Sequence, residues 1–127
     1  MPIKIQRPFR GITINDAHWE VVRVDLNNDA KQGMMYISAW TSLAAKNTGE
    51  LPFESLALKF ERNPANPNAI PSVGVAPSLP YAPNWGLPQL NAAGMNPFKR
   101  GYEILTALPA SYRNFYQLPD FNDGENV

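Results

Sequence analysis

The stretch that decides the fold is HWEVVRVDL, residues 18–26. Its β-branched and aromatic side chains are typical of a strand that packs on at least one face. Simple alternation puts three aliphatic side chains on one face, namely Val22, Val24 and Leu26. The opposite face then carries Trp19, Val21, Arg23 and Asp25. The polar residues 27–33, which end in a glycine, predict a hairpin loop after this strand.

Two further stretches alternate in the same way. Residues 34–42 (MMYISAWTS) have large apolar groups on both faces, so we expect a central strand or one covered on both sides. Residues 54–62 (ESLALKFER) place Leu56, Leu58 and Phe60 on one face and mostly polar groups on the other. Shorter extended pieces are expected before residue 15. Together these segments predict a small antiparallel sheet, a meander.

After Arg62 the character of the chain changes. No charged residue occurs from residue 63 to residue 98, and this stretch holds most of the 13 prolines. Because proline fixes φ and lacks an N–H, we expect extended backbone here rather than a helix or an inner strand. Large apolar side chains cost ~1.5–3 kcal/mol each when they stay in water. This arm, residues 63–95, is therefore expected to be covered, by the chain's own sheet or by a neighbour.

We predict that the arm docks on neighbouring subunits. Extended segments gain backbone partners on another protein, and proline lowers the entropy that docking costs. The apolar residues expected at this interface are Ile70, Val73, Val75, Leu79, Tyr81, Trp85, Leu87 and Leu90. Aromatic groups dominate interface energetics, so the anchors are expected among the last of these, namely Tyr81, Trp85, Leu87 and Leu90.

A helix is predicted after the arm. Asn96 is a favourable N-cap and Pro97 a favourable first helical residue. One apolar stripe runs along it, formed by Phe98, Tyr102, Leu105 and Leu108. The helix is expected over residues 97–108, before Pro109. Gly101 costs up to ~1 kcal/mol relative to alanine but permits close packing on the sheet.

The predicted fold class is α+β and β-rich: a small antiparallel sheet with one C-terminal helix and a long proline-rich arm. A chain of 127 residues suits a single domain. Within it we expect a β-meander over residues 1–62, the arm over 63–95, the helix over 96–109 and a C-terminal tail over 110–127. The last residues of that tail are expected to be mobile.

Composition argues against several function classes. The 11 basic and 11 acidic residues leave no basic excess for nucleic-acid binding. The absence of cysteine excludes disulfides and thiolate zinc sites. No run approaches the ~18 apolar residues of a membrane span, and the N-terminus lacks a signal-peptide core. We expect neither nucleic acid nor membrane as a partner, and synthesis in the cytosol until assembly.

No catalytic constellation emerges from the sequence. The single histidine, His18, is expected at the surface or at a sheet edge, and no Gly-x-Ser-x-Gly elbow is present. By parity, Glu20 and Asp25 point to opposite faces of their strand, so they do not form a carboxylate pair. We therefore predict a protein that is not an enzyme and that has no cofactor and no metal.

Three segments carry a family resemblance. They are residues 17–24 (AHWEVVRV), residues 56–60 (LALKF), and Asn96-Pro97 followed by the helix that ends YEILTALP at residue 109. This order resembles small proteins encoded among the virion genes of tailed phages. In the short members of that group the Asn-Pro helix follows the last strand almost directly, whereas the arm intervenes here.

The resemblance implies a structural role in the tail, baseplate or neck of a phage particle. It implies other virion proteins and further copies of the chain as partners, an oligomeric state in the assembly, and location in the virion after synthesis in the host cytoplasm. It implies no catalytic residue. A capsid decoration or cement protein is a second hypothesis. A carbohydrate-binding module that uses Trp40 and Trp85 is a third.

Overall fold

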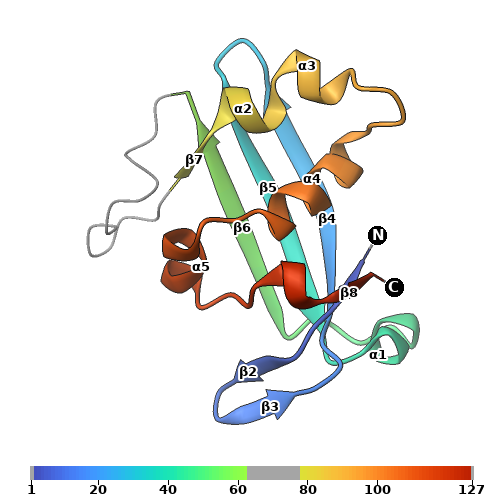
Figure 1. The fold of residues 1–127 in the computed structure, drawn as a ribbon. Coiled ribbons are helices and arrows are strands. Elements are labelled where there is room, and N and C mark those ends of the chain that lie inside the picture. Colours follow the sequence, from blue (N-terminus) through green and yellow to red (C-terminus); the bar gives the residue numbers. More distant parts are fainter. Residues whose placement is uncertain (1, 63–77, 127) are drawn as a thin grey trace.

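The computed structural model describes residues 2–62 and 78–126 (Figure 1). Its strands are β1 (Ile3–Lys4), β2 (Arg7–Phe9), β3 (Ile12–Ile14), β4 (His18–Asn27), β5 (Gln32–Trp40), β6 (Glu54–Glu61), β7 (Ser78–Pro80) and β8 (Glu125–Asn126). Its helices are α1 (Leu43–Asn47), α2 (Tyr81–Trp85), α3 (Leu87–Leu90), α4 (Pro97–Thr106), α5 (Ala110–Tyr116) and the 3₁₀ helix η1 (Phe121–Asp123). The described chain is therefore mixed and β-rich, with several helices where the sequence predicted one.

The main sheet has the strand order β7-β6-β5-β4-β1-β8. The three long strands β4, β5 and β6 are neighbours in chain order and pair antiparallel, whereas β7 adds to β6 in parallel. Chain start and chain end lie side by side, because β8 pairs with β1 at the far edge (Figure 1). The ribbon β2–β3 extends from one end of the sheet, and its two turn residues, Arg10 and Gly11, both have positive φ, as a tight hairpin requires.

A β-bulge interrupts β4. Val21 pairs with Ile37, but Arg23 pairs with Tyr36, so the register shifts between Val21 and Arg23. Two residues of β4 thus correspond to one residue of β5, which is the definition of a bulge. Sequence alternation has a strict period of two, so every face assignment beyond the bulge is inverted.

The predicted faces of β4 are therefore wrong in part. The face that packs on the core carries Trp19, Val21, Val24 and Leu26. The opposite face carries Glu20, Arg23 and Asp25. Glu20 and Asp25 thus share a face, contrary to the parity argument, because the bulge lies between them.

Helix α4 packs across the inner side of the sheet (Figure 1). The predicted N-cap is confirmed, since Asn96 accepts a hydrogen bond from the Lys99 N–H at 2.9 Å. The helix ends at Thr106, two residues before the predicted end. Close packing at Gly101 is also confirmed: an added Cβ would lie 2.9 Å from Met35 Sδ. Phe98, predicted on the apolar stripe, is exposed.

The described half of the arm is extended only at residues 78–80. Residues 81–85 and 87–90 form α2 and α3, and residues 78–80 form the edge strand β7. The prediction that prolines forbid a helix here is wrong, because proline is tolerated in the first turn, where its missing N–H has no intrahelical partner. Pro83 lies in the first turn of α2 and Pro88 in that of α3. Residues 63–77 lie outside the described residues.

The C-terminal segment, which the sequence left as a tail, is part of the core. Tyr112 on α5 and Phe121 on η1 are both buried. The ring of Phe121 meets that of Trp19 edge to face, with 5.1 Å between their centroids. In contrast to the expected mobile end, residues 125 and 126 form strand β8.

Candidate functional site

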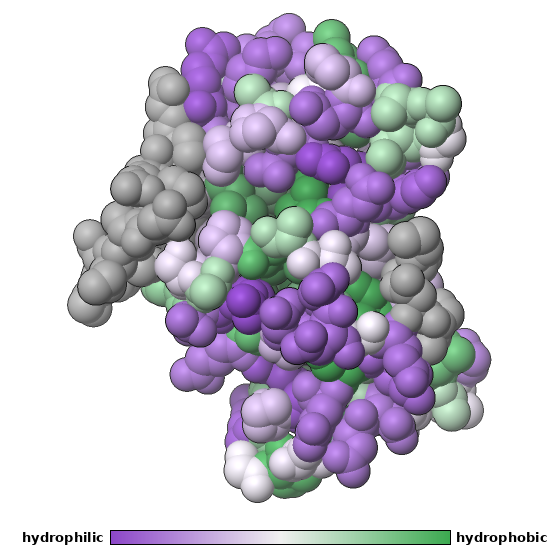
Figure 2. Space-filling view, viewed as in Figure 1, coloured by the Kyte–Doolittle hydropathy of each residue, from purple (hydrophilic) through white to green (hydrophobic). Residues whose placement is uncertain are grey.

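The three long strands have two unlike faces. One face packs against α2, α4 and η1, and its side chains form the hydrophobic core. We call the other the open face, and its side chains are Glu20, Arg23 and Asp25 on β4, Met34, Tyr36 and Ser38 on β5, and Ser55, Ala57 and Lys59 on β6. Figures 1 and 2 view the helix-covered side, where hydrophobic residues show mainly in recesses between hydrophilic ones.

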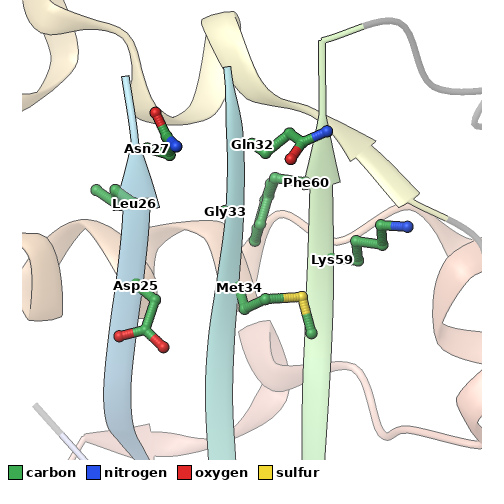
Figure 3. A pocket seen from close by; sticks show the side chains of 8 residues that line it. All are labelled: Asp25, Leu26, Asn27, Gln32, Gly33, Met34, Lys59 and Phe60. Atoms are coloured by element: carbon green, nitrogen blue, oxygen red, sulfur yellow. The ribbon is translucent and has the colours of Figure 1, made fainter. Parts of the chain in front are cut away.

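Two shallow hollows lie on the three long strands. The first, of about 440 Å³, covers their middle and is bordered by Arg23, Tyr36, Ser38, Ser55 and Ala57, among others. The second, of about 270 Å³, lies toward the β4–β5 hairpin and is lined by residues 25–27, 32–34, 59 and 60. Figure 3 shows Met34 reaching from β5 toward β6 in this second hollow.

Polar contacts hold the rim of the open face in place. Arg23 Nε donates to Asp25 Oδ1 at 3.0 Å, and its guanidinium lies 5.6 Å from the ring centre of Tyr36. On β6, Lys59 Nζ lies 2.8 Å from Glu61 Oε1. The hydroxyl oxygens of Ser38 and Ser55 are 2.9 Å apart. Met34 and Tyr36 are half-buried between these groups, so the open face has an apolar centre and a charged rim.

Helix α1 covers one end of this face. The Glu20 carboxylate accepts a hydrogen bond from Lys46 on α1, and Lys46 also lies over the ring of Trp40. His18 Nε2 lies 2.7 Å from Glu20 Oε2. Burial raises the pKa of Glu20, but the hydrogen bonds and charges of Lys46 and His18 outweigh it and lower the pKa below its ordinary value of 4.5.

His18 was predicted at the surface or at a sheet edge, and this is wrong. It lies in β4 between β1 and β5, paired with Lys4 and Trp40, and only 1% of it is exposed. The short strand β1 and the ring of Trp40 supply this cover, and neither is evident from the residues around His18. Its Nδ1 has no hydrogen-bond partner among the described residues.

A buried ion pair lies at the same end of the sheet. Arg7 Nη2 donates to both oxygens of Glu54, at 2.9 and 3.2 Å. The side chains are 8% and 12% exposed, and the guanidinium lies 5.9 Å from the ring centre of Trp19. This pair connects the β2–β3 ribbon to β6, and loss of either partner would leave a buried charge unpaired.

The expected arm contacts are distributed between two environments. Leu79, Tyr81 and Trp85 are buried in the chain's own core, and Leu90 packs against that core. Leu87 is 54% exposed. Ile70, Val73 and Val75 lie outside the described residues. The sequence left open whether the arm is covered by the chain's own sheet or by a neighbour. For the three buried residues the cover is the chain's own core.

Sequence reasoning missed the open face as a candidate site. Simple alternation puts Met34 and Tyr36 on the face of β5 opposite to Met35 and Ile37, and the structure confirms this. Which of these two apolar faces the helices would cover was not decided by the pattern, because both contain large side chains.

The described residues contain neither a metal-binding cluster nor a helix that could span a membrane. Among residues 2–62 and 78–126, no three His, Asp or Glu side chains lie together in a way that holds a metal ion. No helix in the described part of the chain has the length and apolar character needed to cross a membrane. Comparison with protein-family models, curated proteins and solved structures gave no match.

Proposed function

We propose that this chain is a non-enzymatic structural protein that binds other protein subunits through its open face. The observation that carries the proposal is the apolar centre of that face, Met34 and Tyr36, bordered by Arg23, Asp25 and Lys59. Aromatic residues, methionine and arginine are enriched in protein interfaces, and a polar rim surrounds an apolar centre in them. The three long strands serve as a rigid meander that presents this surface.

The setting that we propose is a tailed-phage particle, in the tail, baseplate or neck, with other virion proteins and copies of the chain as partners. Its support is the order of strand, strand, Asn-Pro and helix in the sequence, together with a sheet face that residues 2–62 and 78–126 leave largely uncovered. We propose the open face rather than the arm as the docking surface, because Leu79, Tyr81 and Trp85 belong to the hydrophobic core of this chain.

The carbohydrate-binding hypothesis loses its main support. A sugar ring stacks on an exposed aromatic face, but Trp85 is fully buried against Phe60. Trp40 donates its Nε1–H to the Glu50 carbonyl at 3.0 Å, and the Lys46 ammonium lies over its ring. Neither tryptophan therefore supports this hypothesis.

Incorporation into particles tests the proposal. Particles are grown with the wild-type chain, with the double variant Met34→Glu/Tyr36→Glu, or with Leu87→Glu, and the chain is quantified by mass spectrometry of purified particles. Leu87 is the matched control, since it is an exposed apolar residue from the arm. Circular dichroism of each purified chain confirms that it folds.

We expect the open-face variant to lose roughly tenfold or more of its incorporation, because central apolar residues carry most interface energy. The Leu87→Glu chain is expected to incorporate normally. Full incorporation of the open-face variant would overturn the proposed surface, and a loss confined to Leu87→Glu would restore the arm. If the wild-type chain is absent from particles, the virion assignment itself fails.

A further inference from the structure

Strand β4 has a free edge over most of its length. On one side β5 pairs with it from His18 to Asn27. On the other side β1 pairs only with His18 and Trp19. In the described part of the chain no strand continues β1 beyond Trp19, so residues 20–27 have a strand neighbour on one side only.

The start of this edge is occupied by a side chain from α4. The backbone N–H of Val21 donates to the hydroxyl oxygen of Tyr102 at 3.0 Å, in a buried position. Tyr102 thus takes the place that a neighbouring strand would occupy at the bulge. Residues 22–26 lie beyond it, and this is the part of the edge that remains for pairing.

Residues 22–26 lack several of the features that protect exposed edges. Natural edge strands are made very short, or carry proline, lysine or a bulge, so that other chains do not add to them. The sequence VRVDL has neither proline nor lysine, and the bulge lies at its beginning. Its two charged residues, Arg23 and Asp25, have opposite signs, so they protect the edge against other strands but can complement each other between two copies. Val22 is 44% exposed. By contrast, the opposite edge of the sheet, β7, is three residues long and ends in Pro80.

We propose that a second copy of this chain pairs antiparallel along residues 22–26. The two-fold axis lies midway between Val24 of one copy and Val24 of the other. This register places Arg23 opposite Asp25 of the second copy, and Asp25 opposite its Arg23. Val24 faces its own equivalent, and Val22 faces Leu26 of the second copy. A dimer with this symmetry uses the same patch on both copies, which is the commonest arrangement of homo-oligomers.

The charges select this register over its neighbours. Residues directly opposite each other on two strands point to the same face of the sheet. In a symmetric antiparallel dimer one residue must therefore lie opposite its own equivalent in the second copy, because neighbouring residues point to different faces. A pairing centred on Arg23 would oppose two arginines, and one centred on Asp25 would oppose two aspartates. Only the pairing centred on Val24 brings opposite charges together at both positions.

The inferred dimer deepens the proposed function and rests on it for its biological meaning. A two-fold axis perpendicular to the sheet keeps both open faces on the same side. The two sheets then become continuous through β4, and the two copies present one double-width docking surface with Arg23 and Asp25 at its middle.

Charge-swap variants test the pairing. Arg23→Glu opposes two carboxylates at each of two positions, and Asp25→Arg opposes two guanidinium groups. Lys59→Glu makes the same charge change as Arg23→Glu on the same face but on β6, and it is the matched control. Sedimentation equilibrium gives the dissociation constant of each purified chain, and native mass spectrometry identifies mixed dimers.

We expect the wild type and Lys59→Glu to dimerise alike, and each single variant at β4 to dimerise about tenfold or more weakly. An equimolar mixture of the two β4 variants is expected to form the mixed dimer, because both cross-strand pairs are then complementary. Loss of the ion pair within β4 does not explain such rescue, since each variant chain still lacks that pair.

A wild-type chain that stays monomeric at its highest soluble concentration would overturn the inference. So would a wild-type dimer whose β4 variants bind equally well or fail to form the mixed dimer. These outcomes are distinguishable from failure of the proposed function, because a monomeric chain whose open-face variant still loses incorporation into particles retains its docking role.

Discussion

The two faces of the β4–β6 sheet differ in how deeply their side chains are buried. On the covered face Met35, Ile37, Leu58 and Phe60 are fully buried beneath the helices. The open face carries Met34 and Tyr36, which flank Met35 in the sequence. Both are only half-buried among charged groups. The same strands thus provide stability on one side and, in the function that we propose, a surface for partners on the other. Substitutions on the covered face should change the free energy of unfolding, and those on the open face should change binding.

The largest expected contrast pairs Trp85 with Tyr36. Trp85 is 0% exposed and meets Phe60 edge to face at 5.5 Å, so Trp85→Ala should lower the free energy of unfolding by about 3–5 kcal/mol. Tyr36→Ala on the open face should lower it by less than about 1 kcal/mol. Urea denaturation followed by circular dichroism measures both values. Similar losses for the two variants would show that the open face is also part of the stabilising core.

A second comparison sets the buried ion pair Arg7–Glu54 against the exposed pair Arg23–Asp25. Arg7→Met leaves the Glu54 carboxylate unpaired in a site that is 12% exposed, so we expect a loss of about 3 kcal/mol. Arg23→Met removes an exposed pair with Asp25 on the open face and should leave the unfolding midpoint unchanged at chain concentrations where both proteins are monomeric. Thermal and urea denaturation of both variants provide the comparison, and equal stability of Arg7→Met and wild type would contradict a structural role for Arg7.

Gly101 tests the tight contact between α4 and the covered face. The added methyl of Gly101→Ala would lie 2.9 Å from Met35 Sδ and 3.3 Å from Val21 Cγ1. Overpacking costs about 1–3 kcal/mol, and the helix gains about 1 kcal/mol from alanine, so a net loss of about 1 kcal/mol is expected. A double-mutant cycle with Met35→Val measures the coupling. If Gly101→Ala stabilises the chain, the contact is looser than the structure indicates.

The smallest effect concerns the acid stability of the α1 contact. The folded-state pKa of Glu20 is lowered, so its contribution to stability is present above about pH 4.5 and is lost as the pH falls through the folded value. Because the contact lies near the surface, we expect less than about 1 kcal/mol. Glu20→Gln should therefore lose less stability on acidification than wild type, in denaturation curves recorded from neutral to acid pH. Parallel pH profiles would contradict this account.

Much of the sheet was predictable because alternation acts locally. β5 begins and ends two residues before the predicted range 34–42, and β6 ends one residue before the predicted range 54–62 does. Asn96-Pro97 marked the start of α4. β4 was predicted as a strand, but the faces of its second half were inverted by a one-residue bulge that no residue type announces. The open face became identifiable only after the helices had been placed.

The arm shows the limit of composition as evidence. Eliminating helix from residues 81–90 assumed that proline lies in a helix interior, whereas four- and five-residue helices consist mostly of first turns. The expected need for cover was right for Tyr81 and Trp85, and the surface that covers them belongs to the same chain.

By itself the sequence determined that the segments of β4, β5 and β6 form strands, where α4 begins, and that many apolar groups after residue 77 need cover. These properties depend on local backbone preference and on the period of side-chain direction, both of which lie within a few neighbouring residues. Only the tertiary structure decided which face of the sheet the helices cover, which edge of β4 no other described strand pairs with beyond Trp19, and where His18 and Arg7 are buried. Those outcomes depend on contacts between residues that are far apart in the chain, such as Arg7 with Glu54 and Val21 with Tyr102.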